Sequence, residues 1–153
     1  MTEGRGPVLL AYDGSENARL AIAAAGELLG PRHVLVLHVW ESWAAEAPGL
    51  ARASSSVRGM AAELDAIADE QSEGHTAEGV GLATEAGFEA QGLSERAAGP
   101  VWRSVIDAAE RHDCAAIVAG SRGLTGVSRV LGSVSNGVVH HSRRPVLVVP
   151  GEE

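Results

Sequence analysis

The feature that most constrains this chain is a glycine-rich stretch near its carboxyl end, residues 115–150. A short apolar run is followed there by a loop that holds Gly120, Gly123, Gly126 and Gly132, and Ser133 then opens a segment of helical character. Because glycine has no Cβ, its backbone N–H groups can approach an anion closely, and a helix N-terminus adds unpaired N–H groups and a positive dipole end. The stretch therefore predicts a phosphate-binding turn between a buried strand and a helix. It is not a P-loop, since the chain has no lysine.

The start of the chain predicts a strand, a helix and a second strand. Residues 7–12 (PVLLAY) form a short apolar run that is typical of a strand buried on both faces. The turn at residues 13–15 follows, with Ser15 as the expected N-cap of a helix that ends at residues 30–31. Residues 33–40 (HVLVLHVW) predict the second strand. Two parallel strands joined by a helix make a right-handed βαβ unit.

The middle of the chain has a weaker pattern. Residues 41–53 mix Trp43 and Pro48 with small residues, so we expect a loop of low order. A long helix is expected from about Ser55, with Gly87 as the residue that follows its end. We expect a break in it near Gly74, because glycine inside a helix costs roughly 1 kcal/mol relative to alanine.

The remaining elements complete an alternating α/β pattern. Residues 88–93 alternate weakly and predict the third strand. Pro100 is expected in the first turn of another helix, which ends near His112. Five strands alternating with four helices predict an open parallel sheet covered by helices on both faces, in one domain that spans residues 1–153.

Several of these motifs together resemble the universal stress protein family. The residues that match its pattern are Ala11-Tyr12-Asp13-Gly14-Ser15, His38-Val39, Gly120, Gly123, Gly132-Ser133 and Arg144-Pro145-Val146-Leu147-Val148-Val149. The family's usual spacer between the second and third signature glycines has nine residues, and residues 124–131 supply eight here. The resemblance implies a Rossmann-like sheet of the adenine nucleotide alpha hydrolase type, with the strand order 3-2-1-4-5.

The resemblance also implies a cleft between the first and fourth strands, at the switch point where ligands bind in open parallel sheets. Ala11, Tyr12 and Val39 would form an adenine pocket there, largely through backbone groups. Asp13 would accept ribose hydroxyls or help to hold a metal ion. The phosphates would be bound by the residues around the glycine loop, Gly120, Arg122, Gly123, Gly132 and Ser133. The implied ligand is ATP, or else ADP or AMP, with Mg²⁺ or Mn²⁺ on its phosphates.

Each candidate also has a purely structural interpretation. The glycines can serve tight turns and close packing, Ser133 can cap the last helix, and Asp13 can be an ordinary turn residue. Arg122 and Arg129 can be solvated instead of bound to phosphate. His38 lies inside an apolar strand, which is typical of a hydrogen-bonded core or cleft histidine. No serine or cysteine lies in a catalytic motif, so no catalytic residue is predicted.

Composition argues against several other classes of function. A formal net charge of −8 disfavours general binding to nucleic acid or anionic membranes, which needs a basic face. No apolar run reaches the roughly 18 residues of a membrane span, and residues 1–14 lack the features of a secretory signal. The single cysteine, Cys114, excludes an internal disulfide framework and fits a reducing compartment. We therefore expect a cytoplasmic protein with no membrane and no nucleic-acid partner.

Three functions remain open from the sequence. The leading one is an adenine-nucleotide-binding universal stress protein, active in stress response or signalling and acting mainly by binding. The second is a slow ATPase on the same fold, since no water-positioning group supports rapid phosphoryl transfer. The third is a dimeric interaction module with a vestigial pocket. We also expect a homodimer, because the last strand, which begins at Pro145 and ends at Val149, lies at a sheet edge, and the resemblance implies that it pairs with its twofold mate.

Overall fold

The computed structural model describes residues 6–122 and 131–151. Its strands are β1 (Val8–Ala11), β2 (His33–Trp40), β3 (Glu89–Arg96), β4 (Ala116–Gly120) and β5 (Val146–Val149). Its helices are α1 (Glu16–Leu29), α2 (Trp43–Glu46), α3 (Ser55–Glu85), α4 (Val101–Arg111) and α5 (Ser133–His141), and a 3₁₀ turn, η1, covers Leu50–Arg52.

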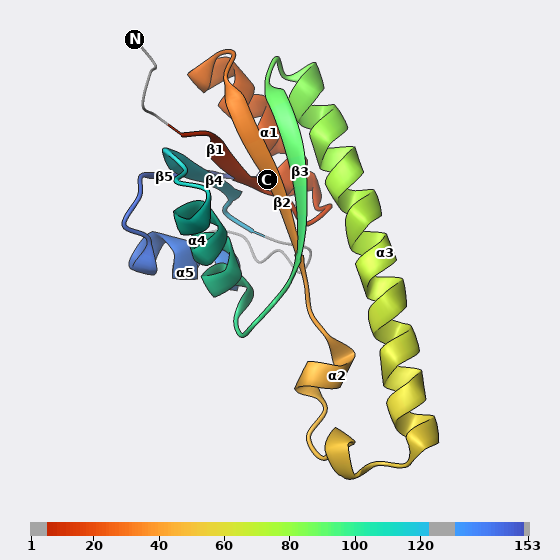
Figure 1. Ribbon diagram of the computed structural model, residues 1–153. Helices are drawn as coiled ribbons and strands as arrows, with labels where there is room; N and C mark the ends of the chain where they lie inside the picture. The colour runs from red at the N-terminus through yellow and green to blue at the C-terminus, as the bar shows by residue number, and fades with distance from the viewer. Residues whose placement is uncertain (1–5, 123–130, 152–153) are drawn as a thin grey trace.

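The five strands form one parallel sheet with the order β3-β2-β1-β4-β5 (Figure 1). The central strand β1 pairs on both sides, so that Leu9 lies beside Leu35 of β2 and Ile117 of β4. From β1 the chain builds outward through β2 and β3, and it then returns to add β4 and β5 on the other side. The switch point therefore lies between β1 and β4, which confirms the predicted fold and strand order.

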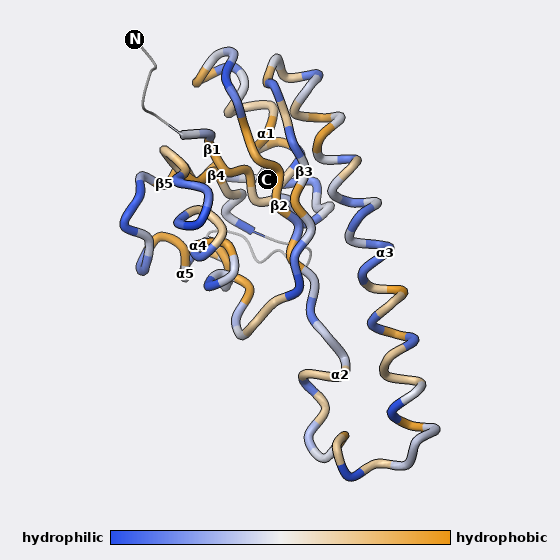
Figure 2. Tube along the Cα trace, viewed as in Figure 1, coloured by the Kyte–Doolittle hydropathy of each residue, from blue (hydrophilic) through white to orange (hydrophobic). Residues whose placement is uncertain are grey.

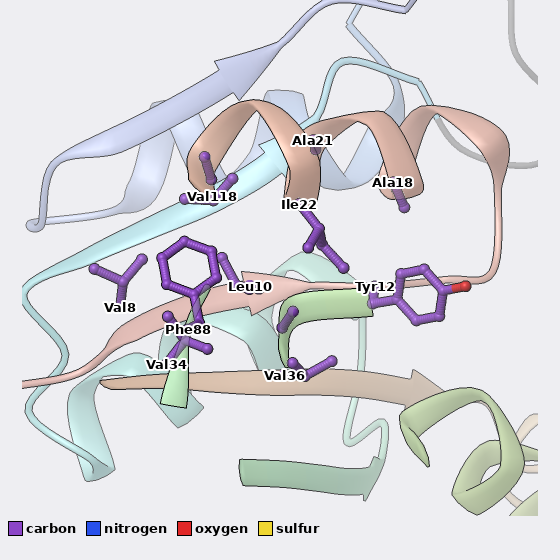
Figure 3. Packing of buried hydrophobic residues seen from close by; sticks show 12 residues of the cluster. Val8, Leu10, Tyr12, Ala18, Ala21, Ile22, Val34, Val36, Phe88 and Val118 are labelled. Carbon is purple, nitrogen blue, oxygen red and sulfur yellow. The ribbon is translucent and has the colours of Figure 1, made fainter. Parts of the chain in front are cut away.

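Successive side chains on a strand point to opposite faces of the sheet, and the central strands are apolar at successive positions. Both faces are therefore apolar, and helices cover each of them. On one face, Leu10 and Tyr12 pack with Ile22 of α1 and with the carboxyl-terminal part of α3 (Figure 3). On the other face, Leu37 packs with Val105 of α4 and with α5. The apolar strands at the centre of the sheet are clear in Figure 2. The aliphatic core thus occupies both faces of the sheet.

The ends of the helices follow the predicted signals with one difference. The Ser15 hydroxyl accepts a hydrogen bond from the Ala18 N–H at 3.1 Å, which caps α1 as predicted. Gly87, with φ of 97°, follows the end of α3 in the left-handed conformation that ends many helices. Pro100 is the N-cap of α4 and does not lie in its first turn as expected.

The third helix differs most from expectation, because α3 is continuous over 31 residues and the break predicted near Gly74 is wrong. Past that point the helix is held by close packing on the sheet. A Cβ on Gly79 would lie only 2.6 Å from Val36 Cγ1, so the backbones approach closely there. Such packing outweighs the small propensity cost of glycine. Although α3 is long, no helix in the described part of the chain is apolar enough to cross a membrane.

The segment before α3 is more ordered than expected, since residues 41–53 contain α2 and η1. The Ser42 hydroxyl accepts from the Ala45 N–H, which caps α2, and it also donates to Asp65 of α3 at 2.6 Å. The third strand is also longer than the predicted residues 88–93. It reaches Arg96 because it pairs with the whole length of β2.

Candidate functional site

A pocket of about 260 Å³ opens at the carboxyl ends of β1 and β4, where the strand order switches. It is lined by residues from β1, β2, β4 and α4, from the first turns of α1 and α5, and from the turns that follow β1 and β4. Ligand pockets are commonly found at this position in open parallel sheets. The place of the pocket in the fold therefore makes it the candidate functional site.

One half of the pocket is apolar. The apolar residues that line it and pack in one cluster are Leu37 and Val39 of β2, Val101 and Val105 of α4, and Ala11 of β1. These side chains come from the core layer that packs under α4 and α5. They form a wall without charged groups that suits a flat, weakly polar ring.

The turn after β1 places a carboxylate at the edge of this wall. Asp13 lines the pocket, and its Oδ1 accepts a hydrogen bond from the Ser15 N–H at 2.9 Å. Gly14 adopts a φ of 82°, which allows the chain to turn sharply into α1. Asp13 is therefore a turn residue, as one interpretation expected, and its carboxylate is held at the pocket by that same turn.

The other half of the pocket is the start of α5. Gly132 is its N-cap, with φ of −65° and ψ of 167°, and no described side chain caps the helix there. Ser133 is the first helical residue, so the interpretation of Ser133 as the cap is wrong. Gly132, Ser133 and Ser135 all line the pocket. The positive end of the α5 dipole and its first N–H groups thus face the cavity, which favours an anion.

Hydrogen bonds hold the two ends of the glycine loop together. The Ser121 carbonyl accepts from the Gly132 N–H at 2.7 Å and from the Ser135 hydroxyl at 3.0 Å. On the other side, Asn17 of α1 accepts from the Arg122 N–H at 2.7 Å and donates to the Val149 carbonyl at 3.1 Å. The rim of the pocket is thereby tied to the start of α1 and to the end of β5.

Tyr12 lines the pocket, and its side chain packs in the core layer under α1 and α3 (Figure 3). Its hydroxyl donates to the Glu78 carboxylate of α3, which also pairs with Arg19 of α1. Burial and this hydrogen bond raise the pKa of Tyr12, and the same hydrogen bond lowers the pKa of Glu78. The three side chains connect α3 to α1 and to the end of β1.

His38 is the hydrogen-bonded histidine that the sequence predicted. Its Nδ1 lies 2.6 Å from the Ser72 hydroxyl, which lies 2.6 Å from the Ser94 hydroxyl, and its ring stacks on His75 at a centroid distance of 5.0 Å. Burial lowers the pKa of His38, and the neighbouring His75 lowers it further. His75 in turn lies against Gly14, where a Cβ would be 3.0 Å from the His75 Nδ1.

The structure brings together nearly all of the predicted site residues. Those that line the pocket are Ala11, Tyr12, Asp13, Val39, Gly120, Arg122, Gly132 and Ser133. Gly123, like Gly126 and Arg129, lies outside the described residues. The roles of these residues toward a ligand stay predictions.

Sequence reasoning missed the contribution of α4 and of two polar side chains. Val101 and Val105, four residues apart on one helix face, carried a signal that could have been read as pocket lining. Asn17 and Ser135, which are buried in the first turns of α1 and α5, carried no sequence signal that marks them as site residues.

A second hollow, of about 610 Å³, lies at the amino ends of the strands beside Arg144. Arg144 pairs there with Glu110 and Asp113, donates to the Cys114 carbonyl, and has its pKa raised by the two carboxylates. Its two Nη groups make these bonds and hold the end of α4 to the start of β5, which is a structural role, while its buried Nε has no partner among the described residues. Nowhere in the described ranges do three or more His, Cys, Asp or Glu residues gather as a metal site.

Comparisons with known proteins agree with this architecture. The universal stress protein family model matches residues 4–150. The hypothetical protein MJ0577 is 23% identical to this chain, with a TM-score of 0.77 and 97% of each chain covered.

Two further solved structures are similar to this chain. A universal stress protein from Archaeoglobus fulgidus in complex with dAMP is 21% identical, with a TM-score of 0.60 and with 94% of this chain and 96% of that chain covered. A universal stress protein in complex with cAMP is 20% identical, with a TM-score of 0.57 and with 95% of this chain and 97% of that chain covered. A search of curated proteins found no match. Since the family pattern extends from residue 4 to residue 150, the chain belongs to the universal stress protein family.

Proposed function

We propose that this chain binds an adenine nucleotide, with ATP as the first candidate, in the pocket between β1 and β4. The observation that carries the proposal is the meeting of an uncharged wall and an uncapped helix N-terminus in one cavity. The wall at Val39 and Val105 would take the adenine ring. Gly132 and Ser133 would take the phosphates through backbone N–H groups and a hydroxyl. The dAMP and cAMP complexes of two proteins with this fold support the choice of an adenine nucleotide.

Asp13 would accept the ribose hydroxyls, because its carboxylate sits between the wall and the helix end. It would also be the protein's ligand to Mg²⁺ or Mn²⁺ carried on the phosphates. Magnesium in such sites commonly keeps several waters and uses one or two carboxylates together with substrate phosphates, and a single Asp13 fits that pattern. The ion would neutralise phosphate charge that Arg122 and the helix dipole also oppose.

The protein would act mainly by binding, in stress response or signalling. Its single cysteine, Cys114, is a buried free thiol whose pKa is raised by burial, which is consistent with a reducing cytoplasm. A slow ATPase on the same pocket is the alternative. It is the weaker one because rapid phosphoryl transfer needs a residue that positions the attacking water, and no motif for one was found in the sequence.

The assembly would be a homodimer through β5. This strand is at the edge of the sheet, and its apolar side chains are only half-buried. The Pro145 carbonyl accepts from the Ile117 N–H of β4, and the Val149 carbonyl accepts from the Ser121 N–H directly after β4. Because hydrogen-bonding direction alternates along a strand, Val146 and Val148 direct their backbone groups outward. An apolar edge of this kind is a template for pairing with a second copy.

Isothermal titration of the purified protein with ATP, ADP, AMP and cAMP, with and without Mg²⁺, tests the proposal. We expect saturable binding of at least one adenine nucleotide at one site per chain. If none of the four binds at millimolar concentration while the protein is folded, the pocket is vestigial and the interaction-module hypothesis becomes the better account.

A further inference from the structure

The first half of α3 projects beyond the sheet. A helix of 31 residues is about 46 Å long, whereas the eight residues of β3 span only about 26 Å. The first hydrogen bonds from α3 to the sheet come from Ser72, which contacts His38 and Ser94. Before that point the helix is accompanied by α2 and η1, and Figure 1 shows these three segments extending together past the ends of the strands.

The projecting half carries an exposed apolar stripe. It consists of Val57, Met60, Leu64 and Ile67, whose exposed fractions are 49%, 63%, 41% and 51%. The spacing of three, four and three residues places them on one side of the helix. Apolar positions alternate with charged ones along this part of the tube in Figure 2. We refer to these four residues as the α3 stripe.

The α3 stripe is not the side of the helix that packs on α2. That side is marked by Asp65, which accepts from the Ser42 hydroxyl and from the Trp43 N–H at 2.7 Å, and by the buried Ala61. Arg58 is on the same side and donates to the Ala51 carbonyl. At about 100° per residue, the stripe lies roughly a quarter turn from this packed side. The contacts with α2 therefore leave the stripe uncovered.

Further along α3 the same side of the helix already binds a helix. Glu78 pairs with Arg19 of α1, and Gly26 of α1 lies against Ala86, where a Cβ would be 2.7 Å from the Ala86 carbonyl oxygen. Steps of seven residues back from Glu78 lead through Gln71 to Leu64 and Val57. The α3 stripe thus continues the surface that α1 covers, beyond the point where α1 begins. Because this side of α3 packs against a helix where α1 covers it, we expect the stripe to accept a helix as well.

Charge indicates the chemistry of the occupant. Glu63 and Glu70 border the stripe on its outer side, and Arg58 is the sole arginine of α3. The acidic residues of this helix are Glu63, Asp65, Asp69, Glu70, Glu73, Glu78 and Glu85. A second copy laid antiparallel on the stripe would bring Glu63 next to its own counterpart, which disfavours self-pairing. Lysine or arginine beside the apolar positions of an incoming helix would instead meet carboxylates.

We infer that the α3 stripe is a docking surface for a basic amphipathic helix of a partner protein. Leucine-like side chains of that helix fill the spaces between Val57, Met60, Leu64 and Ile67, and its basic residues pair with Glu63 and Glu70. Four side chains bury less than the roughly 800 Å² per partner of a stable interface, so the contact is weak and reversible. The stripe lies on the β2–β3 side of the sheet, away from β5, and a dimer through β5 leaves it accessible.

The test uses a fluorescein-labelled synthetic peptide of about 18 residues, with leucines at helical spacing and lysines beside them. Fluorescence anisotropy measures its dissociation constant for the full chain at low and high salt. The matched variants are Met60→Ser/Leu64→Ser, on the stripe, and Leu28→Ser/Val139→Ser, which removes two exposed apolar side chains elsewhere. Circular dichroism and the thermal midpoint confirm that both variants are folded, and sedimentation velocity reports the oligomeric state.

We expect the stripe variant to bind the lysine peptide at least tenfold more weakly and the matched variant to bind within twofold of the unmodified chain. Glu63→Gln/Glu70→Gln should weaken binding severalfold and reduce its dependence on salt. A peptide with glutamate in place of lysine should not bind. Equal affinity of the stripe variant, equal loss in the matched variant, or equal binding of the glutamate peptide would overturn the inference. So would an oligomer that only the stripe variant dissociates, since the surface would then belong to a second copy.

Discussion

Replacing Asn17 with alanine tests how the rim of the pocket is held. Asn17, in the first turn of α1, is 7% exposed and bonds to the residues after β4 and to the end of β5. It accepts from the Arg122 N–H at 2.7 Å and donates to the Val149 carbonyl at 3.1 Å, and the Ser121 hydroxyl donates to it at 3.3 Å. Alanine removes all three bonds at once.

The magnitude follows from these contacts. A typical intramolecular hydrogen bond contributes about 0.5–1.5 kcal/mol net, and a buried group left without a partner costs about 1–3 kcal/mol. The two shorter bonds account for about 2 kcal/mol of unfolding free energy. The Val149 carbonyl keeps its bond from the Ser121 N–H at 2.9 Å, but if the Arg122 N–H finds no other partner, the loss rises to about 4 kcal/mol. Nucleotide affinity should fall as well, because Ser121 and Arg122 lose the side chain that positions them.

Chemical denaturation, monitored by circular dichroism and extrapolated linearly to water, measures the loss. Asn136→Ala is the matched control, because Asn136 is exposed on α5 and the change there should stay within about 0.5 kcal/mol. A loss below about 0.5 kcal/mol for Asn17→Ala, with an unchanged m-value, would refute the account of the rim.

Three further predictions concern assembly, pH and turnover. Val148→Pro removes an outward N–H of β5 without touching a bond to β4, so sedimentation equilibrium should show a dimer converted to a monomer; a dimer that persists would argue against pairing through β5. Because burial holds the pKa of His38 below the unfolded value of about 6.5, its contribution to stability is complete above that pH and is lost as the pH falls through the folded pKa. The urea midpoint should therefore fall less between pH 7.5 and pH 5.5 in His38→Gln than in the unmodified chain. The exposed His112→Gln is the control and should behave like the unmodified chain, and an equal fall in His38→Gln would contradict the prediction. Steady-state ATP hydrolysis with Mg²⁺ should be far slower than the roughly 1–100 s⁻¹ of kinases, and a rate within that range that Asp13→Ala abolishes would favour the ATPase.

Much of the fold was predictable because its signals are local. Short apolar runs such as residues 33–40 are typical of strands covered on both faces, and Ser15 and Gly87 mark helix ends through hydrogen bonds within their own turns. The strand order came from the family resemblance, and the structure confirms it. The turn after β1 and the start of α5 came together because parallel strands end at a common edge.

What could not be predicted depends on contacts between distant segments. The continuity of α3 through Gly74 rests on packing of Gly79 against Tyr12 and Val36, which local propensity does not contain. The full length of β3 depends on its pairing with β2, because its own sequence is mostly polar. Asn17 could not be assigned to the pocket rim, since its partners Arg122 and Val149 are more than a hundred residues away in the sequence.

The measurement that most directly tests the phosphate-binding role of α5 is the nucleotide affinity of Gly132→Val, determined by isothermal titration. Because Gly132 has a φ of −65°, valine adds bulk at the helix start without backbone strain. Gly59→Val is the matched control, since a Cβ at Gly59 meets nothing within 4 Å. We expect affinity to fall at least about tenfold, or about 1.4 kcal/mol, in Gly132→Val and to stay unchanged in Gly59→Val. Equal affinity in all three folded proteins would contradict the claim that phosphates bind at the start of α5.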